Sequence, residues 1–255
     1  DGFVSVEVDP NLAHDGPGTL ASARDLHQRV ARSNVMIKIP ATREGLPAIR
    51  TMIGEGRSVN VTLIFSLERY AEVLEAYVAG LEDLAAKSNA SLAGVSSVGS
   101  FFISRVDTEV DRRLEAVGTP AALALRGKAA IAQARLAYSL FREKHDGARF
   151  RRVAIYGARV QRPLWASTST KNPAYDELLY VDTLAAPETV NTMPDPTLER
   201  FASVGNPSRT LLAETTTRSE LAATLSQLPS LGISLKEITD TLERDGVAAF
   251  VSSYD

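Results

Sequence analysis

The chain has 255 residues, of which 44% are hydrophobic and 23% are charged, and its formal net charge is -3. This composition is typical of a globular protein with a substantial core, and the charge balance offers no basic surface for nucleic acid. The chain has no cysteine and only 3 histidines, which excludes thiolate chemistry and argues against a metal site built from these residues. A membrane span would need about 18 consecutive apolar residues, and the sequence has no such run. The sequence is compatible with a cytoplasmic protein.

Predicted strands and helices alternate in the first half of the chain. Strands are predicted where polar and apolar side chains alternate or β-branched residues cluster, and helices where apolar residues recur every three or four positions. The predicted strands cover 3–9, 35–40 and 59–65, and the predicted helices cover 17–32, 45–54 and 67–87. Ser66 is the expected N-cap of the third helix.

The second half continues the same alternation with longer helical stretches. The predicted strands cover 100–104, 164–168 and 189–193, and the predicted helices cover 107–117, 120–144 and 173–184. The segment 152–158 has the composition of a strand, but Gly157 could close a short helix, which we favour because 164–168 makes a better strand. The remainder, 196–255, is predicted to be mostly helical, with Ser234 capping a helix over 235–244.

Alternating strands and helices predict a parallel sheet, either open and doubly wound or closed into a barrel. No strand is followed by a glycine-rich nucleotide-binding turn. Several strands instead carry polar side chains on one alternating face near their C-terminal ends. These are Ser5, Glu7, Lys38, Asn60, Thr62, Ser104, Ser167 and Asn191. Polar groups there are typical of the upper interior of a (β/α)8 TIM barrel, whereas the strands of a covered open sheet are apolar on both faces.

The number of predicted strands is smaller than a complete barrel requires. Six strands of this kind are predicted, whereas a (β/α)8 barrel has eight. The chain also opens at Asp1 directly into a strand, without an initiator methionine. We therefore expect residues 1–255 to form a single barrel domain that lacks the first one or two β/α units at its N-terminal side and ends in a helical segment, 196–255.

Lys38 is the first candidate for chemistry, because it lies inside the apolar strand 35–40. The other lysines of the chain lie in polar or helix-surface contexts. Burial penalises the charged ammonium form, and a neutral amine attacks a carbonyl to form a Schiff base. The alternative is structural: the side chain could extend past the strand end to solvent or pair with a carboxylate.

The chain resembles the transaldolases, specifically their longer bacterial form, in one stretch per strand. The matching stretches are VSVEVDPNLA (4–13), IKIPAT (37–42), NVTLIFS (60–66), SFFISRVD (100–107), QRPLWASTSTKNP (161–173) and TVNTMP (189–194). The resemblance implies a class I aldolase-type barrel without metal or cofactor. Its expected activity is to transfer a dihydroxyacetone unit from a ketose phosphate, sedoheptulose 7-phosphate or fructose 6-phosphate, to glyceraldehyde 3-phosphate or erythrose 4-phosphate, in the non-oxidative pentose phosphate pathway.

The resemblance also implies roles for individual residues. It makes Lys38 the Schiff-base nucleophile, and Glu7 and Thr62 the residues that hold a catalytic water beside it. A carboxylate paired with Lys38 remains the alternative for Glu7. Asn60 and Ser104 match residues that bind the hydroxyl groups of the dihydroxyacetone portion.

The phosphate of the substrate is expected to bind at the barrel mouth, where Arg105, Ser167 and Lys171 are the candidates. Here the chain departs from the shorter transaldolases, because Ser169 replaces one of their arginines, and Arg162 is an alternative. The family's acid/base aspartate ends the first barrel strand, which is not among the predicted strands. Asp9 and Asp107 are in the wrong places to replace it.

Two other activities are compatible with the sequence. One is a different class I aldolase, acting on fructose 6-phosphate or deoxyribose phosphate, although the long stretch between Asp107 and Arg162 argues against the short fructose-6-phosphate aldolases. The other is a phosphosugar-binding barrel without catalysis. We expect sugar phosphates as the partners and a monomer or homodimer.

Overall fold

Residues 2–87, 91–206, 211 and 217–254 are described in the computed structural model of the protein, and they form an α/β fold around one parallel sheet. Its strands lie in sequence order, and the sheet curls into a half-barrel. They are β1 (Val4–Glu7), β2 (Val35–Pro40), β3 (Val59–Ile64), β4 (Ser97–Phe102), β5 (Gln161–Ala166) and β6 (Val190–Asn191). The predicted α/β class and parallel sheet are thus confirmed. Because every neighbouring pair of strands is parallel, the C-terminal ends of the strands all lie at the same edge of the sheet.

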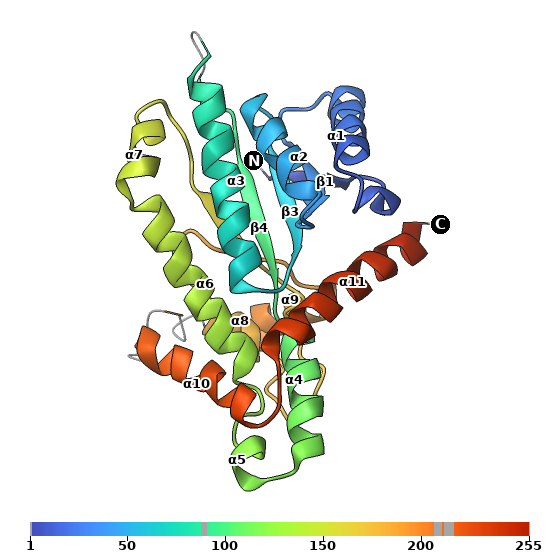
Figure 1. The fold of residues 1–255 in the computed structure, drawn as a ribbon, viewed down its shortest axis with the longest axis vertical. Coiled ribbons are helices and arrows are strands. Elements are labelled where there is room, and N and C mark those ends of the chain that lie inside the picture. Colours follow the sequence, from blue (N-terminus) through green and yellow to red (C-terminus); the bar gives the residue numbers. More distant parts are fainter. Residues whose placement is uncertain (1, 88–90, 207–210, 212–216, 255) are drawn as a thin grey trace.

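Helices connect successive strands and cover one face of the sheet, with α2 and α3 against β3 and β4 (Figure 1). Those before β5 are α1 (Gly16–Val30), α2 (Gly45–Gly54), α3 (Leu67–Ala85), α4 (Ser104–Val117), α5 (Pro120–Leu123), α6 (Ala129–His145) and α7 (Ala148–Ala154). Those after it are α8 (Leu179–Thr183), α9 (Asp195–Val204), α10 (Arg218–Ser230) and α11 (Leu235–Tyr254). A short 3-10 helix, η1 (Pro10–Leu12), follows β1. Among the described residues, no helix is long and apolar enough to cross a membrane.

Two predicted helices differ from the structure. The predicted helix 120–144 is divided into α5 and α6, because Gly127 adopts a left-handed conformation (φ 68°) and its N–H donates to Asp111. Only the end of the predicted helix 173–184 forms, as α8. The carboxamide of Asn172 and the carboxylate of Asp176 accept hydrogen bonds from the backbone two residues on, and such turns compete with a helix.

The boundaries of the later strands also differ from those predicted. β4 begins three residues earlier than predicted and ends at Phe102, so Ser104 is the first residue of α4 and does not belong to the strand. β5 likewise begins at Gln161, whose buried side chain donates to Ser97. The segment 152–158 forms the end of α7 and a turn, which confirms the helix over the strand. In the C-terminal segment, residues 207–210, 212–216 and 255 lie outside the described residues.

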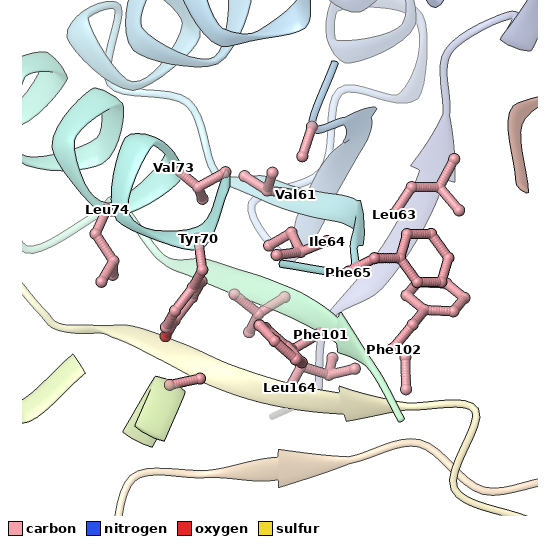
Figure 2. Close-up of a cluster of buried hydrophobic side chains, with 14 of the residues drawn as sticks. Val61, Leu63, Ile64, Phe65, Tyr70, Val73, Leu74, Phe101, Phe102 and Leu164 are labelled. Atoms are coloured by element: carbon pink, nitrogen blue, oxygen red, sulfur yellow. The ribbon is translucent and has the colours of Figure 1, made fainter. Parts of the chain in front are cut away.

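A cluster of buried hydrophobic side chains lies where α3 packs against β3 and β4 (Figure 2). Tyr70 of α3 meets Phe101 of β4 edge to face, with ring centroids 5.7 Å apart. Gly99 makes this packing feasible, since a Cβ there would lie 3.0 Å from the Tyr70 ring. Phe65 and Phe102 form a second ring pair at the C-terminal ends of β3 and β4, with centroids 5.0 Å apart. The first ring pair therefore joins α3 to β4, and the second joins the ends of β3 and β4, the strands that carry Asn60, Thr62 and Ser100.

The crossing of α2 over α3 depends on a glycine. A Cβ at Gly80 of α3 would lie 2.7 Å from the carbonyl oxygen of Arg50 and 2.8 Å from Cβ of Ile53, both on α2. These atoms belong to the backbone and to a β-branched side chain, so they cannot move aside without moving the helix. Close approach of the two helices thus requires glycine at this position.

We predict that Gly80→Ala lowers the free energy of unfolding by about 1–2 kcal/mol, because overpacking outweighs the gain in helix propensity. Urea denaturation measures this change. Gly94→Ala is the matched control, since a Cβ at Gly94 meets no atom within 4 Å. Equal stability of the Gly80→Ala variant and the unmodified protein would contradict the packing argument.

Candidate active site

Glu7 and Lys38 lie opposite each other on neighbouring strands. The register of β1 and β2 pairs these two residues, and Lys38 Nζ donates to Glu7 Oε2 over 3.1 Å. The Lys38 side chain is 24% exposed and that of Glu7 is 30% exposed, so both are partly withdrawn from water. This is the pairing that the sequence left open as a structural alternative, and its surroundings decide what it can do.

The pair opens into a cavity of about 530 Å³ at the C-terminal edge of the sheet. Its lining comes from β1 to β5, from the residues that follow the strands, and from α11. The lining residues are Ser5, Glu7, Lys38, Asn60, Thr62, Ser100, Phe102, Arg105, Leu164, Ala166, Ser167, Thr192 and Phe250. A larger cavity of about 680 Å³ continues along the same face toward the start of the strands and shares Ser5, Asn60, Leu164 and Thr192. Lys38 therefore faces a chamber large enough for a small ligand.

Asn60 is held in place by two hydroxyl groups from other strands. Its Nδ2 donates to Ser5 Oγ over 3.0 Å, and its Oδ1 accepts from Ser100 Oγ over 2.7 Å. A carboxamide has two N–H groups and two acceptor lone pairs, so one of each remains for a ligand in the cavity. Asn60 is thus oriented before any ligand arrives.

Thr62 lies at an irregularity in β3. The pairing of β3 with β4 shifts register between Val61 and Ile64, and Leu63 adopts a left-handed conformation with φ 59°. Such a bulge changes the direction of side chains and is frequent next to active sites. The Thr62 hydroxyl is buried and has no hydrogen-bond partner within the described part of the chain. It therefore brings a free donor and acceptor to the cavity wall.

Burial raises the pKa of the Glu7 carboxyl above its ordinary value, and the neighbouring Lys38 charge and hydrogen bond only partly offset this effect. A carboxyl group with a raised pKa exchanges protons more readily near neutral pH than an ordinary glutamate does. On its other side, Lys38 Nζ lies 4.7 Å from the centroid of the Phe250 ring. The amine is therefore enclosed by a carboxylate and an aromatic ring, with the cavity in front of it.

The structure brings most of the predicted site residues to this cavity, but two of them do not line it. Ser104 is buried at the start of α4 and its Oγ lies 3.0 Å from Ser167 Oγ. Lys171 is exposed and donates to Ser169. Ser100 of β4, which was not among the predicted site residues, lines the cavity.

The cationic end of the cavity is formed by Arg105. Its guanidinium lies 5.2 Å from the centroid of the Phe102 ring. Ser167 directly follows β5 and adopts a left-handed conformation with φ 57°, which turns the chain at the cavity edge. Arg162, the alternative phosphate candidate, lies at the start of β5 and lines only the larger cavity. Asn191 accepts a hydrogen bond from Thr168, which is a structural contact.

Among residues 2–87, 91–206, 211 and 217–254, no group of three or more histidine, aspartate or glutamate side chains is placed to hold a metal ion. The polar groups of the cavity are one amine, one carboxylate, one guanidinium, one carboxamide and several hydroxyls.

Comparison with known proteins gives one family for the whole chain. The family model described as Transaldolase/Fructose-6-phosphate aldolase matches residues 1–255. The chain belongs to the transaldolase/fructose-6-phosphate aldolase family. The resemblance to transaldolases predicted from the sequence is thus confirmed.

Several members of this family are similar over the full chain. It is 53% identical to Transaldolase 1 of Streptomyces coelicolor over 256 residues, covering 100% of this chain and 66% of that protein. It is 52% identical to the transaldolase of Mycolicibacterium smegmatis over 254 residues, covering 100% of this chain and 68% of that protein. The transaldolase of Mycobacterium tuberculosis (strain ATCC 25618 / H37Rv) is 50% identical over 256 residues, with 100% and 68% covered. The chain thus spans about two thirds of the length of these curated relatives.

In this member of the transaldolase/fructose-6-phosphate aldolase family, a buried carboxylate supports the helix that carries Arg105. Asp107 is 1% exposed and accepts hydrogen bonds from the N–H of Ala130 (2.7 Å) and the hydroxyl of Tyr180 (2.8 Å). It thereby joins α4 to α6 and α8. Burial raises the pKa of Asp107 to about 6, although both hydrogen bonds favour the charged form.

We predict that Asp107 makes the protein less stable as the pH rises from 4.5 to 7. In the folded protein Asp107 keeps its proton up to a pH of about 6, whereas in the unfolded chain it loses the proton near pH 4. Between these pH values the folded state binds more protons than the unfolded state, so the free energy of unfolding falls as the pH rises. The free energy of unfolding of Asp107→Asn should therefore gain about 2 kcal/mol relative to the unmodified protein between pH 4.5 and pH 7.

Urea denaturation at the two pH values measures this difference. Asp25→Asn, which changes an exposed carboxylate on α1, is the control for the loss of one carboxylate from the chain. Parallel pH curves for Asp107→Asn and the unmodified protein would show that Asp107 does not titrate in this range.

Proposed function

We propose that the protein is a transaldolase that carries a dihydroxyacetone unit from a ketose phosphate to an aldose phosphate as a Schiff base on Lys38. The observation that carries this proposal is the position of Lys38 Nζ, which faces a cavity of about 530 Å³ beside a carboxylate that can exchange protons. Family membership and relatives named transaldolases support it.

The reaction follows from the groups in the cavity. The neutral amine of Lys38 attacks the ketose carbonyl at C2, and loss of water gives an iminium. Glu7 and the Thr62 hydroxyl hold the water that moves protons on and off the departing oxygen, because both line the cavity that Lys38 faces. The iminium accepts the electron pair of the C3–C4 bond, and the aldehyde leaves with the C4 oxygen after its hydroxyl proton is removed. The enamine then attacks the acceptor aldehyde, and hydrolysis frees Lys38.

The substrate is held at both ends. Asn60 and Ser100 bind the hydroxyl groups of the dihydroxyacetone portion, since their mutual hydrogen bond fixes both groups toward the cavity. Arg105 and Ser167 bind the phosphate, with Lys171 on the loop that follows Ser167 as a further cation. Ser104 was predicted to bind the substrate directly. In this proposal it instead positions Ser167 through the hydrogen bond between their hydroxyl groups.

We propose in addition that the half-barrel is part of an eight-stranded barrel. In the described part of the chain, the outer edges of β1 and β6 pair with no further strand, and closed barrels remove such edges. In a complete barrel, the base that removes the C4 hydroxyl proton would come from a strand beside β1. Sugar phosphates are the ligands that the proposed transaldolase activity requires. The cytoplasmic location and the monomeric or dimeric state stay predictions.

A fructose-6-phosphate aldolase is the second candidate, because the matched family contains both activities by name. The two differ in the fate of the enamine, which a transaldolase keeps until an aldose phosphate arrives. We predict that fructose 6-phosphate is consumed only when erythrose 4-phosphate is present. Coupled measurement of glyceraldehyde 3-phosphate and of free dihydroxyacetone distinguishes the two, and steady release of dihydroxyacetone without acceptor would establish the aldolase.

We predict that borohydride reduction with fructose 6-phosphate adds a mass to the protein and that Lys38→Arg abolishes both this adduct and turnover. Arginine keeps the charge beside Glu7 but cannot form an imine. Lys236→Arg is the control, because Lys236 lies on the surface in an ion pair with Asp240. Intact-mass and peptide analysis locate the adduct. An adduct that survives in Lys38→Arg would disprove the assignment, and absence of any adduct would favour a binding protein without catalysis.

A further inference from the structure

The last helix, α11, lies across the C-terminal end of β3 and contacts α4 and η1 (Figure 1). Its docking point is Gly246, where a Cβ would lie 2.8 Å from the side chain of Leu63 at the bulge of β3. Phe250 follows one turn later, on the same face of the helix. The helix that carries Phe250 thus packs against the same bulge that places Thr62 at the cavity.

Phe250 lies between two cavities. It lines the cavity of about 530 Å³ in front of Lys38 and also a second one of about 320 Å³. The second cavity is bordered by Glu7, Pro10, Ser253 and Tyr254 in addition to Phe250. The ring is therefore part of the wall that separates the amine from this second, more open space.

The same ring approaches the reacting nitrogen. Lys38 Nζ lies 4.7 Å from the ring centroid, within the distance at which the face of an aromatic ring attracts a cation. Glu7 contacts the nitrogen at 3.1 Å and supplies the other favourable interaction with a positive charge. The two differ in one respect, because a carboxylate loses its charge when it takes up a proton and an aromatic ring does not.

We propose that Phe250 is a catalytic residue that stabilises the positively charged iminium on Lys38 and closes the nitrogen off from the second cavity. The inference rests on the proposed Schiff-base function. Condensation of the neutral amine with the ketose forms the C=N bond, and the carbonyl oxygen leaves as water with one proton from the amine and one from the Glu7 carboxyl, so the nitrogen keeps a positive charge. Cleavage of the C3–C4 bond then moves an electron pair onto the enamine and removes this charge.

The ring therefore acts on the charged states before and after the enamine, and much less on the neutral enamine itself. Its effect is largest when Glu7 is protonated and cannot neutralise the iminium. Replacing the ring with an aliphatic side chain of similar size keeps the wall apolar but removes the attraction for the cation. An effect of that replacement thus separates charge stabilisation from packing.

The test measures the concentration of fructose 6-phosphate that gives half-maximal borohydride labelling of Lys38. We expect Phe250→Leu to raise this concentration by about three- to thirty-fold, the range that a partly desolvated cation–π contact supports. Phe250→Tyr keeps the ring face and should stay within about three-fold of the unmodified protein. Tyr254→Leu, which removes an aromatic ring from the next turn of α11, is the matched control and should label normally.

Binding of sorbitol 6-phosphate, which has no carbonyl group, reports whether the cavity itself is intact. Calorimetry should give the same affinity for Phe250→Leu and for the unmodified protein. The inference is overturned if Phe250→Leu labels normally, if Phe250→Tyr falls as far as Phe250→Leu, if Tyr254→Leu has an equal effect, or if sorbitol 6-phosphate binding weakens in parallel. Failure of the unmodified protein to be labelled would instead overturn the proposed function.

Discussion

The ion pair between Glu7 and Lys38 depends on the register of two parallel strands. β1 and β2 pair residue for residue from Val4 and Val35 onward, so these two side chains emerge together at the edge where both strands end. A shift of one residue would turn one of them to the helix-covered face and leave the other unpaired. A partly buried charge without a partner is unfavourable, and the register of the sheet therefore also fixes the geometry of the site.

The surroundings leave this pair accessible to a ligand, as the proposed Schiff-base chemistry requires. A lysine tied to a carboxylate in a closed core has no access to a ligand, whereas Lys38 lies on a cavity with oriented polar groups. Asn60 is fixed by hydroxyls from β1 and β4, and the bulge in β3 turns Thr62 inward. The C-terminal helix packs against that bulge at Gly246, and this contact brings Phe250, which is far from Lys38 in the sequence, to the Lys38 nitrogen.

Much of this arrangement could be predicted from the sequence, because strand alternation places Glu7, Lys38, Asn60 and Thr62 on one face. The prediction of Ser104 in place of Ser100 shows where alternation fails. Both serines have the same parity, but β4 ends at Phe102 and the chain turns into α4, which no pattern in SFFISRVD marks. Phe250 could not be predicted either, since only the tertiary docking of α11 brings it to Lys38. Side-chain turns likewise overrode the helical pattern after β5.

The role of Lys38 is tested most directly by a crystal structure of the protein after reduction with borohydride in the presence of fructose 6-phosphate. If Lys38 forms the Schiff base, the electron density is continuous from Lys38 Nζ to C2 of the sugar, and the adduct lies in the cavity between Asn60 and Arg105. Unmodified Lys38 still bonded to Glu7, with the sugar phosphate bound elsewhere or attached to another lysine, would contradict it.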